Sequence, residues 1–244
     1  GCGEVSLMTI EEFVEDISVV SDERRLIEHP YRDGRRKNHL LQYLRHLERS
    51  GVDVMLVGEA PGYRGCALTG IPFTDEFQLK LPANIYALGA WERSGGIGNT
   101  SERSASAVWA ALREYHIIPL MWNAFPFHPY QEGKIASNRT PAQSELKEGL
   151  WYLDALRSIF SIKDSQVFAV GKKAKEILGV TSASHYIRHP ANDFKREFRP
   201  QFDLKIGKPY GRRPGDTLRH TTGEADAPER MKGGSGYDSP TLVS

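Results

Sequence analysis

Three polar side chains with complementary chemistry follow segments that are expected to form buried strands. The apolar run 55–57 leads to Glu59, a second apolar run ends in Asn123, and a short run at 186–188 leads to His189. A carboxylate can orient or deprotonate water, an amide both donates and accepts hydrogen bonds, and an imidazole donates a hydrogen bond or a proton. If these three side chains surround one cavity, they can bind a small planar ligand and act on it chemically.

Glycine residues and a phenylalanine lie at and after the first of these strand ends. Residues 58–62 have the sequence Gly-Glu-Ala-Pro-Gly, and residues 69–73 have the sequence Thr-Gly-Ile-Pro-Phe. Glycine lets the backbone approach a ligand closely, and Phe73 offers a face on which a flat base can stack. Taken alone, the segment fits an ordinary strand and turn with Phe73 in the core equally well.

Apolar runs that predict strands alternate with amphipathic runs that predict helices. The predicted strands are residues 52–57, 118–123, 167–171 and 186–189. The predicted helices are residues 10–20, 38–50, 77–90, 101–115, 140–160 and 172–178. Such alternation requires a parallel sheet with right-handed crossovers. We therefore predict an α/β fold, a three-layer α/β/α sandwich with a central four-stranded parallel sheet, in which the polar strand ends share one edge.

Several predicted helices carry local end signals. Thr9 and Glu12 form a capping-box pattern at the start of the first helix. Gly51 is expected to supply a left-handed end to the second helix. Thr140 is expected to cap the helix that follows it, with Pro141 in the first turn.

The composition favours one domain with appendages over two domains. The chain has 244 residues, 39% hydrophobic residues and a net charge of +1. We expect a helix and surface extension at 1–37, the main domain at 38–209 and a disordered tail at 210–244. No apolar stretch approaches the roughly 20 residues that span a bilayer, so no membrane partner is expected.

Cysteine usage argues against a metal or a cluster. Cys2 and Cys66 are the cysteines of the chain and lie far apart. They supply neither a disulfide framework nor a four-cysteine set for iron–sulfur or zinc. We expect no cofactor, and we expect Cys66 to be chemically inert.

Together the motifs resemble those of the uracil-DNA glycosylase superfamily, which carries a Gly-x-x-Pro first motif, a middle strand ending in Asn and a late His-Pro motif. The resemblance covers about residues 38–202. The first motif and the Thr-Gly-x-Pro-Phe segment are similar to the thermophilic iron–sulfur branch. Residues 62–65 and 188–190, with 197–199, are similar to a less characterised bacterial branch without a cluster.

The resemblance implies a monofunctional DNA glycosylase that hydrolyses the N-glycosidic bond of uracil, and as a wider option that of other deaminated bases, in base-excision repair. Glu59 would orient or deprotonate water and stabilise the cationic sugar, and His189 would donate to the charge that develops on O2 of the base. Asn123 would match O4 and N3–H of uracil, and Phe73 would stack on the extruded base. The remaining residues of the predicted substrate site are Gly58, Ala60, Gly62 and Tyr63.

Two positions depart from the strongest uracil-specific members. An activating Asp and a Tyr that blocks the methyl group of thymine are replaced here by Ala60 and Gly62. Tyr63 is a candidate to take over the steric role. His128, at another strand end, is expected to make a structural hydrogen bond.

The expected partner is DNA that contains uracil in a single strand or a mispair, since such a base costs least to flip out. We expect a cytoplasmic, nucleoid-associated monomer. Because the net charge is close to zero, a local basic face must bind the phosphates. The candidates for wedge and phosphate contacts are Asn192, Phe194, Lys195, Arg196 and Arg199.

Two other functions remain open at this stage. A non-catalytic module could keep the pocket to bind a base or nucleotide, which Ala60 and Gly62 would favour. Hydrolysis of a free nucleoside or nucleotide is a third option, and it would depend little on salt.

Overall fold

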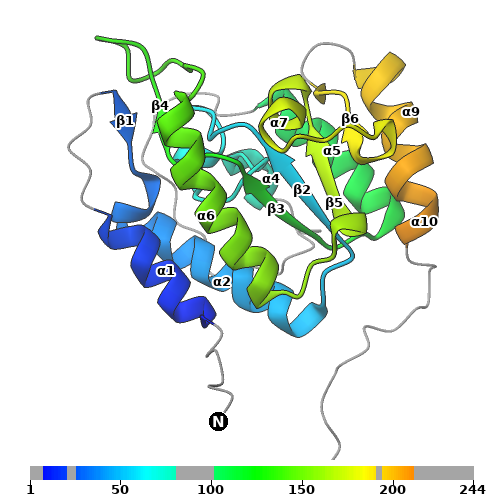
Figure 1. Cartoon of the computed structure of the whole chain (residues 1–244), viewed down its shortest axis with the longest axis horizontal. Coiled ribbons are helices and arrows are strands. Elements are labelled where there is room, and N and C mark those ends of the chain that lie inside the picture. The colour runs from blue at the N-terminus through cyan, green and yellow to red at the C-terminus, as the bar shows by residue number, and fades with distance from the viewer. Residues whose placement is uncertain (1–7, 21–25, 81–101, 191–193, 212–244) are drawn as a thin grey trace, which may run out of the picture.

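Four short apolar segments form a parallel sheet at the centre of the molecule (Figure 1). The structure, a computed structural model, describes residues 8–20, 26–80, 102–190 and 194–211. The strands of the sheet, in the order of their pairing, are β3 (Pro119–Asn123), β2 (Val54–Gly58), β5 (Val167–Val170) and β6 (Tyr186–Ile187). Every residue of β2 and β3 is buried, which explains their continuous apolar sequences. The predicted four-stranded parallel sheet is confirmed.

Helices on both sides of the sheet complete the predicted α/β/α sandwich (Figure 1). The α-helices are α1 (Ile10–Val19), α2 (Gly34–Ser50), α3 (Cys66–Thr69), α4 (Glu76–Lys80), α5 (Arg103–Tyr115), α6 (Gln143–Ile159), α7 (Lys172–Ile177), α9 (Arg199–Phe202) and α10 (Lys208–Tyr210). Two further strands, β1 (Ile27–Glu28) and β4 (His128–Pro129), pair antiparallel. The core includes Phe13 of α1, whose ring meets those of Trp122 and Tyr152 edge to face.

The register of the sheet brings its strand ends to one edge. Gly58, the last residue of β2, lies opposite Asn123, the last residue of β3. Val170 of β5 lies opposite Ile187 of β6. Because all four strands run in the same direction, the residues that follow them emerge together at this edge.

Local sequence signals set the ends of the first two long helices. Thr9 and Glu12 form the predicted capping box, with N···O distances of 2.8 and 3.1 Å. Gly51 ends α2 with the positive φ of 77° that the prediction requires, but its ψ of 164° is extended and not that of a left-handed helical cap. α2 begins at Gly34, earlier than the predicted residue 38, because the Asp33 side chain accepts hydrogen bonds from two backbone N–H groups of its first turn.

The prediction that Thr140 caps the helix expected at residues 140–160 is wrong. α6 begins at Gln143, and Glu145 in its first turn accepts a hydrogen bond from the backbone N–H of Ala142 at 2.6 Å. Arg139 holds the carboxylate of Glu145 in place through two hydrogen bonds of 3.0 Å. This ion pair, formed between residues on either side of Thr140, takes over the capping role.

A tyrosine side chain closes the outer edge of β3. The hydroxyl group of Tyr43, on α2, donates to the carbonyl oxygen of Pro119 at 3.2 Å and accepts from the backbone N–H of Met121 at 2.6 Å. Tyr43 is fully buried. The hydroxyl therefore satisfies two backbone groups that a neighbouring strand would otherwise pair.

Parts of several predictions lie outside the described residues. These parts are residues 1–7 and 21–25 of the predicted extension 1–37, residues 81–90 of the predicted helix 77–90, residue 101 of the predicted helix 101–115, most of the tail 210–244, and the loop that contains Asn192. In the described part of the chain, no helix has the length and apolar character that crossing a membrane needs.

The substitution Tyr43→Phe should reduce the free energy of unfolding by about 1–3 kcal/mol, because it leaves two buried backbone groups without a partner. Urea unfolding should show a lower midpoint with an unchanged slope. The matched change Tyr130→Phe, at a half-buried tyrosine away from the sheet edge, should alter stability by less than about 0.5 kcal/mol. An unchanged midpoint for Tyr43→Phe would contradict the assignment.

Candidate active site

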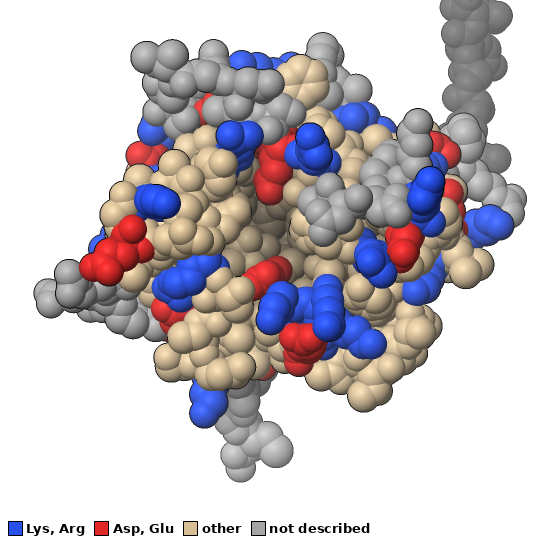
Figure 2. Space-filling view, turned by 90° about the horizontal axis from the view of Figure 1, so that it is seen from above, with Lys and Arg blue, Asp and Glu red and all other residues tan. Residues whose placement is uncertain are grey.

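A cavity of about 650 Å³ opens at the carboxyl edge of the sheet. The view onto this edge shows it as a hollow in the surface (Figure 2). The side chains of Glu59, Asn123 and His189, which follow or end three different strands, all line it together with Phe73. The four groups that could do chemistry therefore share one space.

The side chains of two of these groups, Asn123 and Phe73, both lie close to Gly58. A Cβ atom on this glycine would lie 2.7 Å from Oδ1 of Asn123 and 2.7 Å from Cζ of Phe73. Any side chain here would displace the amide or the ring. Beyond the strand, the backbone N–H of Phe125 donates to the carbonyl of Glu59 at 3.0 Å, which extends the pairing past the end of the sheet.

Phe73 has a left-handed backbone conformation, with φ of 53°. This conformation costs a non-glycine residue roughly 1–2 kcal/mol. Buried hydrogen bonds hold it: Thr69 donates to the Thr74 carbonyl at 2.8 Å, and Trp109 donates to the Thr74 hydroxyl at 3.1 Å. Backbone strain that surroundings enforce in this way is typical of functional sites.

Glu59 is half-buried, and this burial raises the pKa of its carboxyl above the usual value. A hydrogen bond from Thr140 and the positive charge of Lys173 act in the opposite direction but are smaller effects. Thr140, which does not cap its helix, thus contacts the candidate catalytic carboxylate. A carboxyl with a raised pKa is a stronger base once it is ionised.

His189 is placed by the ends of β5 and β6. Gly171, with φ of 96°, lies against it: a Cβ atom there would be 3.3 Å from Cδ2 of His189. The backbone N–H of the preceding Arg188 donates to the side chain of Gln201 at 2.8 Å. Although part of His189 remains exposed, surrounding protein atoms desolvate its ring and lower its pKa. The ring is therefore neutral at neutral pH.

The remaining residues of the predicted substrate site, Gly58, Ala60, Gly62 and Tyr63, also line the cavity. Tyr63 is anchored by its backbone N–H, which donates to Asn138 at 3.1 Å. The guanidinium of Arg64 lies 5.3 Å from the centre of the Tyr63 ring. These placements agree with the predicted site, and the roles of the residues stay predictions.

Of the predicted DNA-binding residues, Arg196 and Arg199 are described with their side chains, and neither lines the cavity. Asn192 lies outside the described residues, and Phe194 and Lys195 are described for their backbone only. Arg196 is exposed away from the cavity lining. Arg199 pairs with Glu114 and Asp203, each at 2.5 Å, and a phosphate contact would have to break these ion pairs.

Several cavity residues were not predicted to be part of the site. Arg64, Arg103, Lys172 and Lys173 are exposed basic residues at its rim. Lys and Arg side chains surround the hollow in the space-filling view (Figure 2). The paired lysines after Gly171 are visible in the sequence, but nothing in the sequence indicates that Arg103 reaches the same cavity.

Glu102 is a second acidic residue of the cavity that sequence analysis missed. Burial is the main cause that raises the pKa of its carboxyl, and the charge of Asp75 acts in the same direction. It stands before a helix, where it resembles any solvent-exposed acidic residue in the sequence.

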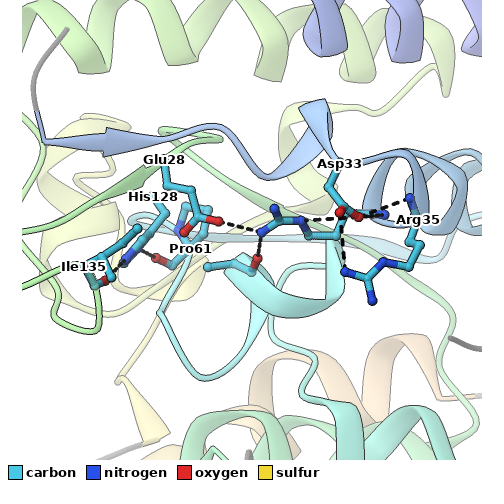
Figure 3. Close-up of polar contacts among 8 residues, drawn as sticks. Glu28, Asp33, Arg35, Pro61, His128 and Ile135 are labelled. Carbon is cyan, nitrogen blue, oxygen red and sulfur yellow. Dashed lines mark hydrogen bonds and ion pairs between the residues drawn. The ribbon is translucent and has the colours of Figure 1, made fainter. Parts of the chain in front are cut away.

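His128 supports the wall of the cavity. Its ring nitrogens lie 2.8 Å from the carbonyl oxygen of Pro61 and 3.1 Å from that of Ile135 (Figure 3). The predicted structural hydrogen bond of His128 is confirmed, and it fixes the first motif. In the same region Glu28 and Asp33 take part in a polar cluster with α2 (Figure 3).

Cys66 is buried and lines the cavity, and this burial raises the pKa of its thiol. A thiol with a raised pKa is a poor nucleophile. Among the described residues, no group of three His, Cys, Asp or Glu side chains could hold a metal ion.

Comparison with known proteins identifies a family. The sequence model described as the uracil DNA glycosylase superfamily matches residues 45–205, which is more than half of the chain. No curated protein matches significantly. Among solved structures, the crystal structure of wild-type SMUG2 from Pedobacter heparinus has 15% sequence identity and a TM-score of 0.49, and the match covers 82% of this chain and 91% of that chain.

The substitution Glu59→Gln should stabilise the fold at neutral pH. Burial raises the pKa in the folded state above the unfolded value of about 4.3, so ionisation favours the unfolded chain. The stability gain should be absent below the unfolded pKa and grow as the pH rises through the folded pKa. Thermal unfolding from pH 4 to 8 measures it, with Glu48→Gln on the exposed face of α2 as the control. A lower midpoint for Glu59→Gln at pH 7 would oppose this account.

Proposed function

The chain belongs to the uracil DNA glycosylase superfamily, and we propose that it is a monofunctional DNA glycosylase that hydrolyses the N-glycosidic bond of uracil in DNA, as a step of base-excision repair. One observation carries the proposal: a single cavity at the sheet edge is lined by a carboxylate, an amide, an imidazole and a partly buried aromatic ring. Other deaminated bases are a wider substrate option.

In this proposal Phe73 and Asn123 recognise the flipped base. The Phe73 ring offers the stacking surface, and the amide of Asn123 donates to O4 and accepts from N3–H of uracil. Cytosine presents the opposite polarity at this edge, so it would leave two buried polar pairs mismatched. The close approach of both side chains to Gly58 supports this arrangement, because they border the same space.

Bond cleavage sends the electron pair of the C1′–N1 bond to the base and leaves the sugar cationic. The Glu59 carboxylate stabilises that cation and takes a proton from the water that adds to C1′. The neutral ring of His189 donates a hydrogen bond to O2 of the departing base. The lowered pKa of His189 and the raised pKa of Glu59 support these roles near neutral pH.

The basic rim is the proposed phosphate-binding surface. Arg64, Arg103, Lys172 and Lys173 are exposed around the cavity opening, where the backbone of a flipped nucleotide must pass. The net charge of +1 gives no overall attraction to DNA, so a local cluster is required.

A non-catalytic module that binds a base is the alternative. Ala60 lines the cavity and brings no acid or base to it, so Glu59 alone supplies carboxylate chemistry within the first motif. Tight binding of uracil-containing strands without turnover would favour this alternative.

Release of free uracil from a labelled U·G duplex tests the proposal. The wild type should release uracil, and His189→Ala should be slower by about 10²–10³-fold, the usual loss for one donor to a developing anion. Asn123→Ala should also lose its preference for uracil over cytosine. The control His116→Asn changes an exposed histidine whose φ of 52° asparagine tolerates. A wild type that leaves every deaminated base intact would refute the proposal.

The double variant Lys172→Ala/Lys173→Ala should bind duplex DNA more weakly. If each lysine neutralises one phosphate, the slope of log K against log salt should fall by about 1.8. Titration of a fluorescent U·G duplex at several salt concentrations measures it. Lys147→Ala and Lys163→Ala, at exposed lysines outside the cavity lining, are the controls. If neither turnover nor binding changes with salt concentration, a free nucleoside is favoured as the substrate instead.

A further inference from the structure

Glu102 stands at the N-cap position of α5 but does not cap it. Its side chain makes no hydrogen bond to the backbone of the first turn. Instead it lines the cavity, and the hydroxyl of Ser104 donates to Oε1 at 3.1 Å. Glu102 therefore contacts a side chain of the first turn of α5 and borders the space where a ligand would lie.

Two glycines of the first-motif segment make room for this carboxyl group. A Cβ atom on Gly62 would lie 3.0 Å from Oε1 of Glu102, and a Cβ atom on Gly65 would overlap Oε2. Gly62 does not have a positive φ, so its backbone does not require glycine. The carboxyl group of Glu102 occupies the volume that side chains at these positions would fill.

The position of Glu102 is coupled to that of Phe73. Asp75, two residues after Phe73, is fully buried and accepts a hydrogen bond from the backbone N–H of Glu102 at 2.5 Å. Another oxygen of Asp75 accepts from the backbone N–H of Gln78 at 2.9 Å, which fixes the carboxylate. Asp75 therefore ties the backbone of Glu102 to the chain segment that carries Phe73.

The proposed function determines which edge of the base is left to face Glu102. His189 takes O2, Asn123 takes N3–H and O4, and Glu59 faces the sugar. The C5 edge of the pyrimidine is left for lining residues that these roles do not use, which include Gly62, Cys66 and Glu102. The inference that follows rests on that function.

We propose that Glu102 is a specificity-determining residue that bars bases with an apolar group at C5, so that uracil is accepted and thymine is excluded. The carboxyl group fills the space beside Gly62 where the methyl group would lie. A methyl group in contact with the Glu102 carboxyl group would also displace water from it without providing a replacement hydrogen bond. Burial already raises the pKa of this carboxyl, in keeping with a site where little solvent remains.

The test compares U·G and T·G duplexes with the wild type and with Glu102→Ala, Glu102→Gln and Glu48→Ala. The readout is the ratio of kcat/KM for uracil to that for thymine. Glu102→Ala should reduce this ratio by about ten- to two-hundredfold, the range that one methylene-sized group controls in a pocket. Glu102→Gln, with the same shape, should restore most of the ratio, and the exposed Glu48 on α2 should not affect it.

A ratio that stays at the wild-type value in Glu102→Ala would overturn the inference. So would an equal loss for both bases with a lower thermal midpoint, which marks a purely structural role. Equilibrium binding of single strands that contain one uracil or one thymine gives a second ratio, that of the two dissociation constants. If the wild type cleaves neither base, the proposed function fails. In that event the inference stands only if Glu102→Ala still reduces the ratio of the affinity for the uracil strand to the affinity for the thymine strand.

Discussion

The parallel register of β2 and β3 is the constraint on which the candidate site depends. It places Gly58 opposite Asn123, and the missing side chain of Gly58 lets the amide and the Phe73 ring approach the same point. Side chains alternate between the faces of a sheet, so a shift by one residue would turn Asn123 to the other face. The closure of the outer edge of β3 by Tyr43 protects this register.

Several groups of the cavity are held in unfavourable states by their surroundings. Glu59 and Glu102 are carboxyl groups that burial makes harder to ionise, and Phe73 has a left-handed backbone. Each reduces stability, whereas the buried hydrogen bonds of Thr74 and Asp75 keep the segment in place. Stability given up at a site and supplied by the surrounding fold is a common feature of enzymes.

Electrostatics here act locally. With a net charge of +1, the chain as a whole neither attracts nor repels nucleic acid. Basic residues at the cavity rim are contributed by the segment after β2 and by the first residues of α5 and α7, and the view onto the sheet edge shows Lys and Arg side chains around the hollow (Figure 2). A basic residue near a motif is not automatically available, since Arg199 is bound to Glu114 and Asp203. Position on the fold matters more than the count of charges.

The sequence by itself determined the four strands, their parallel arrangement and the residues at their ends, because apolar runs, glycines and helix alternation are local features. Glu59, Asn123 and His189 could be found because the ends of parallel strands must share an edge. The cap of α6 was mispredicted, since it depends on the ion pair of Glu145 with Arg139. Only the tertiary structure decided that Glu102 fills the space beside Gly62, because contacts between distant segments leave no periodic trace in the sequence.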